Sequence, residues 1–197
     1  MNWKQPKVYA VKHKDEATRA ASRSGGIFTA LSDQVLSNGG VVYGCVLTDE
    51  FDAVHIRTDN EEDRNRMRGS KYIQSKLGDT FKSVKTDLDA KRSVLFSGTS
   101  CQVAGLKKYI GKEYDNLFCV DIVCHGVPSK KIWEAYLRWQ EQKMHSEVAS
   151  VDFRNKKDFG WHDHVETERL RVVRYSRNFS MGIPCCGRVA MNVPISL

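Results

Sequence analysis

The 197-residue chain lacks several features that would assign it to a common class at once. It contains no apolar run near the ~18 residues that a membrane-spanning helix needs, and residues 1–7 form no apolar signal-peptide core. It has no Cys-x-x-Cys pair, no Walker-type phosphate loop and no Gly-x-Gly-x-x-Gly motif. These absences argue against a membrane protein, a secreted protein, a compact zinc finger, a P-loop enzyme and a standard Rossmann dinucleotide site.

Composition and charge place the chain among ordinary soluble proteins. Apolar residues make up 41% and charged residues 28%, a balance that predicts a packed core rather than disorder. The formal net charge of +7 suits anionic cofactors or an acidic protein partner as well as nucleic acid. Nucleic-acid binding is the weaker alternative, because the charge is spread along the chain without a basic aromatic helix, zinc finger or RNP motif.

The six cysteines are expected to be thiols, since a cytoplasmic location is the default without a signal peptide and disfavours disulfides. Cys45 and Cys119 lie inside apolar runs and are interpreted as core residues. Cys101 and Cys124 differ, because each follows an apolar run, lies in a loop of small residues and precedes a helix-like segment. This repeated context predicts a site at the carboxyl edge of a parallel sheet, where open α/β folds bind ligands.

Three roles stay open for Cys101 and Cys124: metal or cluster ligation, structural burial and thiol chemistry. His125 directly follows Cys124, so a thiolate–imidazolium nucleophile is weighed against a loop-orienting hydrogen bond. The orienting role is favoured, because the side chains of adjacent residues usually point apart.

Strand-like and helix-like patterns alternate, which predicts a mixed, largely parallel α/β sheet with flanking helices and an irregular C-terminal tail. Helices are predicted at residues 27–36, 81–88, 102–110 and 129–144, with Ser24 as the N-cap of the first, and the charged residues 59–67 are compatible with a further helix. Strands are predicted at residues 40–47, 53–57, 93–96, 117–123 and 148–154, the first two of them antiparallel. We expect a domain over residues 1–160 and a poorly determined segment over residues 161–197, truncated or frame-shifted.

Glycine-rich and polar loops supply the expected cofactor-binding residues. Ser24-Gly25-Gly26 opens a predicted helix whose N–H groups can hold an anion, although such turns are common. Residues 68–75 offer guanidinium, ammonium, amide, phenol and hydroxyl groups, a dense set for a phosphorylated ligand or a plain solvated loop. A third loop offers further backbone donors. The full set is Ser24, Gly25, Gly26, Arg68, Ser70, Lys71, Tyr72, Gln74, Ser75, Gly98 and Thr99.

Four motifs, in order, resemble one family. They are residues 24–26, residues 68–75, residues 95–102 (Leu-Phe-Ser-Gly-Thr-Ser-Cys-Gln) and residues 121–129 (Asp-Ile-Val-Cys-His-Gly-Val-Pro-Ser). Together they are similar to the beta subunit family of coenzyme F420 hydrogenases and dehydrogenases. The resemblance implies an iron–sulfur flavoprotein oxidoreductase that passes electrons between clusters, FAD and a substrate such as the deazaflavin F420.

The same resemblance implies where the cofactors bind. FAD would draw on the Ser-Gly-Gly turn and residues 68–75, and Cys101 and Cys124 would face a 4Fe-4S cluster. A cluster usually has four protein ligands, so the other two would come from Cys185 and Cys186 or from sequence outside this chain. The implied partners are a ferredoxin or ferredoxin-like subunit and a small-molecule electron acceptor, with no membrane.

The chain departs from the family pattern in three places. Ser100 stands where members commonly have proline. The ferredoxin-like segment that begins many bacterial members is missing, and arginine-rich sequence replaces the usual C-terminal region. An inactive remnant or a partner-binding α/β domain is therefore the alternative function.

Overall fold

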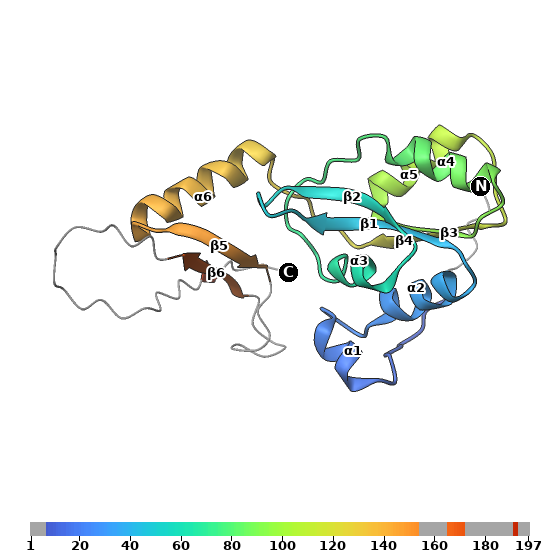
Figure 1. Cartoon of the computed structure of the whole chain (residues 1–197), viewed down its shortest axis with the longest axis horizontal. Helices are drawn as coiled ribbons and strands as arrows, with labels where there is room; N and C mark the ends of the chain where they lie inside the picture. The colour runs from blue at the N-terminus through green and yellow to red at the C-terminus, as the bar shows by residue number, and fades with distance from the viewer. Residues whose placement is uncertain (1–6, 154–164, 172–190, 193–197) are drawn as a thin grey trace. The chain divides into compact units, whose positions relative to one another are not determined.

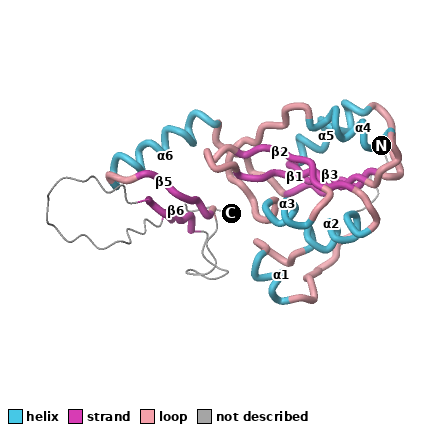
Figure 2. The backbone as a smooth tube through the Cα atoms, viewed as in Figure 1, coloured by secondary structure: helices cyan, strands magenta, loops and turns pink. Residues whose placement is uncertain are grey.

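The computed structural model describes residues 7–153, 165–171 and 191–192. Helices and strands alternate along the first of these ranges (Figures 1 and 2), which confirms the predicted α/β class. The elements are α1 (Glu16–Ala21), α2 (Ile27–Ser37), β1 (Val41–Leu47), β2 (Ala53–Thr58), α3 (Glu61–Arg66), α4 (Thr80–Asp89), β3 (Val94–Thr99), α5 (Ser100–Ile110), β4 (Leu117–Ile122), α6 (Lys130–Met144), β5 (Glu147–Asp152), β6 (Val165–Arg171) and β7 (Met191–Asn192).

A four-stranded sheet has the order β2-β1-β3-β4. Strands β1 and β3 pair in parallel from Val41 opposite Val94, and β3 and β4 pair in parallel through to Thr99 opposite Ile122. A short turn closed by a 2.9 Å hydrogen bond from Thr48 N–H to Asp52 O joins β1 to β2. Such a short connection allows only an antiparallel arrangement, so the predicted mixed, largely parallel sheet is confirmed.

A second sheet has the order β5-β6-β7, and both of its pairings are antiparallel. Two of its strands lie in the segment that was predicted to be irregular, and for those residues the prediction is wrong. The sequence of β6, Val-Glu-Thr-Glu-Arg-Leu-Arg, is too polar to resemble a strand. This segment is a strand because it pairs with β5.

The chain divides into two compact units that interleave along the sequence. The first unit comprises residues 1–44, 56–69 and 79–122, and the second comprises residues 45–55, 70–78 and 123–197. The boundary predicted near residue 160 lies outside the described residues and stays a prediction.

The core of the first unit is built on the parallel strands. The apolar runs at residues 41–43 and 94–96 are at most 1% exposed, because strands of a parallel sheet are covered on both faces. Figure 1 shows α4 and α5 on one side of these strands and α2 and α3 on the other. Leu88 of α4 and Leu106 of α5 are fully buried.

A buried polar network lies within this unit. Asp87 accepts hydrogen bonds from Tyr43 Oη at 2.6 Å and from Arg57 Nε at 2.8 Å. Burial by itself would raise the pKa of Asp87, but the bonds from Arg57 and Tyr43 outweigh it and lower that pKa. The carboxylate therefore stays charged and links β1 and β2 to α4.

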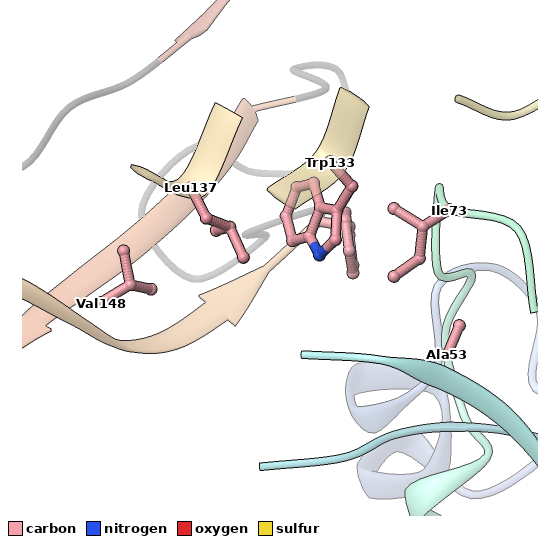
Figure 3. Close-up of a cluster of buried hydrophobic side chains, with 6 residues drawn as sticks. Ala53, Ile73, Trp133, Leu137 and Val148 are labelled. Carbon is pink, nitrogen blue, oxygen red and sulfur yellow. The ribbon is translucent and has the colours of Figure 1, made fainter. Parts of the chain in front are cut away.

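The second unit has its own apolar cluster (Figure 3), formed by Ala53, Ile73, Trp133, Leu137, Val148 and Phe153. Trp133 and Leu137 project from one face of α6, where they are four residues apart, toward Ile73 and Val148. The Trp133 indole N–H also donates to Phe51 O at 3.0 Å, so the buried ring keeps a polar partner.

Most of the predicted elements are confirmed within a few residues, with three local differences. Helix α1 was not predicted; it is short, and its start signals are Asp15, whose carboxylate caps Thr18 N–H, and Glu16 in the first turn. The N-cap of α2 is Gly26 rather than Ser24, so that prediction is wrong. Helix α5 begins at Ser100, which places Cys101 in the first helical turn instead of a loop.

Within the described residues, no helix combines the length and the apolar character needed to cross a bilayer.

Candidate functional site

The N-terminus of α2 is shaped by two glycines that no other residue replaces easily. Gly26 has a left-handed backbone (φ +79°) and starts the helix without any side-chain cap. Gly25 lies against residues 11–13: a Cβ there would come within 2.7 Å of Val11 O, and Gly25 O accepts from His13 N–H at 2.6 Å. The helix N-terminus therefore keeps the N–H-rich, electropositive character that binds anions.

Two sequence motifs meet at this helix end. Arg68 Nε donates to Thr29 Oγ1, in the first turn of α2, at 3.1 Å. Gly69 lies close to Arg23, because a Cβ on Gly69 would come within 2.8 Å of Arg23 Nε. The structure thus brings the predicted residues Gly25, Gly26 and Arg68 into one region. Ser24 is exposed in the same turn.

A third arginine, which the sequence patterns did not single out, supports this region. Arg64 is 1% exposed and donates to Thr29 O at 3.1 Å and to Ser32 Oγ at 2.7 Å. Its guanidinium is neutralised by an ion pair with Asp33. Burial, together with repulsion from Arg64, lowers the pKa of Arg68. The attraction of an anion beside Arg68 would offset both effects by stabilising the charged guanidinium.

The residues after β3 form a compact helix start. The Thr99 N–H donates to Gln102 Oε1 at 2.9 Å, so this backbone donor, which was predicted to face a ligand, already has a partner. Gly98 is buried, and a Cβ there would come within 2.9 Å of the same Gln102 oxygen. Ser100 Oγ donates to Asp121 Oδ2 at 3.0 Å and so ties α5 to β4.

Cys101 is exposed, with its Sγ 3.1 Å from Thr99 Oγ1. It follows the carboxyl end of β3, a parallel strand, as predicted from its sequence context. It lies in the first turn of α5, at the N-terminal end of that helix.

Cys124 belongs to the second unit and is also exposed. Its Sγ accepts from the Gly126 N–H at 3.4 Å, and among the described residues no hydrogen bond joins it to His125. An N–H to sulfur bond of this kind is typical of cluster ligands. Within the described residues no three His, Cys, Asp or Glu side chains are grouped to hold a metal ion, and Cys185 and Cys186 lie outside them.

The other two described cysteines differ from this pair. Burial raises the pKa of Cys45 and of Cys119, both of which are partly buried. Their raised pKa values agree with the prediction that they are packing residues rather than reactive thiols.

The rest of the predicted stretch, residues 70–75, lies in the second unit. Ile73 is buried in its apolar cluster, and Tyr72, 43% exposed, packs edge-on against Phe153. Lys71 and Ser75 interact with the Cys45 thiol, while Ser70 is half-buried. The Gln74 N–H donates to Pro128 O at 3.4 Å, which joins this stretch to the loop that carries Cys124.

Arg23, Thr29 and Arg64 were missed by sequence reasoning. A signal was present for Arg64, since Arg64 and Arg68 are four residues apart and share a helical face if α3 is extended. Thr29 gave no signal, because its contact depends on how α2 packs.

The fold and the site together define an α/β protein in which arginines gather at a helix N-terminus. A thiol follows one of its parallel strands. The family model for the C terminus of the coenzyme F420 hydrogenase/dehydrogenase beta subunit matches residues 91–190, and the model for the N-terminal part of that subunit matches residues 8–82. The chain belongs to this family, which confirms the resemblance drawn from the four motifs. The first match runs into the segment that was expected to be frame-shifted.

Among solved structures, a chain of the F420-reducing NiFe hydrogenase complex from Methanosarcina barkeri, studied as a xenon derivative, has the same fold. The TM-score is 0.56 at 16% sequence identity, over 81% of the present chain. The match covers 55% of the hydrogenase chain, so the present chain spans about half of that relative. No curated protein matches the sequence.

Proposed function

We propose that the chain is the flavin-binding part of an oxidoreductase that passes electrons between an iron–sulfur centre or ferredoxin and FAD. From FAD they pass to coenzyme F420 or another small acceptor. The observation that carries the proposal is the meeting of Arg68 with the N-terminus of α2. Family membership supplies the class of chemistry.

The residues at this helix end fit the phosphate portion of FAD. The N-terminus of α2 has no side-chain cap, and Arg68 adds a guanidinium that can bind phosphate oxygens in pairs. Arg64 donates a hydrogen bond to Thr29 O, and Asp33 neutralises the charge of Arg64. Ser24, Gly25 and Gly26 would supply hydroxyl and backbone contacts beside Arg68.

The remaining proposed contacts come from other loops. Ser70, Lys71, Tyr72, Gln74 and Ser75 follow Arg68 directly in sequence, and the exposed Tyr72 ring is suited to stacking on a flat cofactor. Gly98 and Thr99 are proposed to approach the cofactor through the Thr99 hydroxyl and through backbone atoms other than the Thr99 N–H, which already donates to Gln102.

When bound, FAD supplies both hydride transfer and single-electron transfer. The protein's own contribution would be to hold the phosphates at α2 and to orient the rest of the cofactor.

The described thiols fit a 4Fe-4S cluster only in part. Cys101 and Cys124 are exposed and each has a hydrogen-bonding neighbour at sulfur, but a cluster takes four ligands. We therefore propose these two cysteines as ligands and derive no reaction step through the cluster. The other ligands would come from Cys185 and Cys186 or from a ferredoxin-like subunit.

Anaerobic reconstitution of the full chain with iron, sulfide and FAD tests the proposal. The expected product has flavin absorbance bands, plus a broad cluster absorbance that Cys101→Ala and Cys124→Ala each remove while flavin remains. Cys45→Ala is the matched control and should keep both. A colourless, cofactor-free protein would contradict the proposal and favour the inactive or partner-binding domain.

A further inference from the structure

The outward face of α6 carries cations and apolar side chains but no carboxylate. Its buried face is formed by Trp133, Leu137 and Gln140, which recur at helical spacing. The positions on the side of α6 opposite this buried face are exposed. Ala135, which has a small side chain, lies among the larger exposed residues. We call this surface the α6 stripe, and its residues are Lys131, Ile132, Arg138, Trp139, Gln142 and Lys143.

The two carboxylates of α6 border the stripe, and each has a partner outside it. Glu134 pairs with Lys130 at 3.4 Å, and Glu141 accepts from the Val148 N–H at 3.1 Å. Both are half-buried on the helix edge next to the packed face. The two lysines and the arginine of the stripe therefore form a cationic surface, and the two acids at its border are each bound to another group.

Two large apolar side chains lie among these cations. Ile132 is 63% exposed and Trp139 is 46% exposed. The Trp139 ring lies 6.2 Å from the Tyr136 ring, and Lys143 Nζ lies 4.8 Å from its centroid, so the indole is held in place at the surface. A fixed tryptophan next to arginine is the composition of a binding hot spot.

We propose that the α6 stripe docks an acidic protein, namely the carboxylate-rich face of a ferredoxin-type electron carrier. Charge complementarity argues for this partner, since the three charged side chains of the stripe are all positive and the chain as a whole carries +7. An anionic membrane suits the stripe less well, because the apolar face of α6 is already buried and only two large apolar side chains are free to insert. This inference rests on the proposed function in one respect, namely that the acidic partner is an electron carrier.

Binding of a bacterial-type 4Fe-4S ferredoxin to the full chain, measured at low salt by calorimetry, tests the docking surface. The double variant Lys131→Glu/Arg138→Glu should bind about tenfold more weakly, and raising the salt should weaken wild-type binding. Trp139→Ala should also weaken binding without changing the salt dependence. Lys82→Glu/Lys85→Glu, the same charge change at exposed positions of α4, is the matched control and should bind like wild type.

The proposal is overturned if wild type does not bind the ferredoxin, or if the α6 double variant binds as tightly as the α4 control. Vesicles of phosphatidylcholine and phosphatidylglycerol form a second arm. Loss of vesicle binding in the α6 variant, with no ferredoxin binding by wild type, would assign the stripe to a membrane instead. Binding is measured on protein without added cofactors, so failure of FAD or cluster reconstitution leaves this result standing.

Discussion

Arg68 and Thr29 are 39 residues apart in sequence, yet Arg68 Nε donates to Thr29 Oγ1 at 3.1 Å. The bond joins the residue that follows the C-cap of α3 to the first turn of α2, and it sets a guanidinium beside a helix N-terminus that has no side-chain cap. Both features attract anions, and the lowered pKa of Arg68 reflects burial and a second nearby arginine. This pairing is the physical basis for our proposal that the chain binds a phosphate-bearing cofactor.

The glycine that starts α2 provides a stability test. Gly26→Ala should lower the free energy of unfolding by about 2 kcal/mol, because an L-residue is disfavoured at positive φ. In addition, the new methyl group would lie 3.0 Å from His13 Cβ. Gly39→Ala is the matched control, with φ +71° and nothing within 4 Å of the added atom. Equal losses in urea unfolding for the two variants would show that the His13 contact has no effect.

Asp87 should make folding stability depend on pH. Its pKa is lower in the folded protein than in the unfolded chain, so its contribution is fully present above the unfolded value of about 3.9. That contribution is lost as the pH falls through the lower, folded-state value. Asp87→Asn should therefore destabilise the protein by about 1–3 kcal/mol at pH 7, and by much less near pH 3.

Asp59→Asn is the control for this measurement, since the exposed Asp59 carboxylate contacts the same Arg57 at 3.5 Å. It should change stability by less than about 0.5 kcal/mol at either pH. Denaturant unfolding at the two pH values gives the comparison, and a loss for Asp87→Asn that is unchanged at low pH would refute the assignment.

The described cysteines should react in a fixed order with iodoacetamide at neutral pH. Cys101 and Cys124 are exposed, whereas Cys45 and Cys119 are partly buried with pKa values raised by burial. Peptide mass spectrometry should show the exposed pair alkylated about tenfold faster or more. Slow labelling of Cys101 or Cys124 in protein free of metal would indicate that the thiol is covered, and would count against its proposed ligand role.

The sequence predicts much of this fold for a simple reason. Burial can be predicted directly from apolar runs such as residues 94–96 and from the helical spacing of apolar residues in α6. The two adjacent glycines, Gly25 and Gly26, likewise indicate the start of a helix at a place where only small residues fit. Local chemistry of this kind is visible without knowing what packs against it.

What the sequence does not predict depends on tertiary contacts. Ser24 has the right chemistry for an N-cap, but the left-handed Gly26 starts the helix two residues later. In the sequence, Arg64 resembles an exposed charge on an acidic helix. In the structure, α2 covers it, and Asp33 of α2 forms an ion pair with it. Strand β6 forms from a polar sequence because β5 pairs with it.

The affinity of the full chain for FAD, measured by flavin fluorescence titration, tests the central claim most directly. Wild type should bind one FAD, and Arg68→Ala should bind about 10- to 100-fold more weakly, since a charge-assisted bond contributes about 1.5–3 kcal/mol. Arg66→Ala removes the same charge from an exposed neighbour and should bind like wild type. No FAD binding by wild type, or equal affinities for the Arg68 and Arg66 variants, would contradict the account.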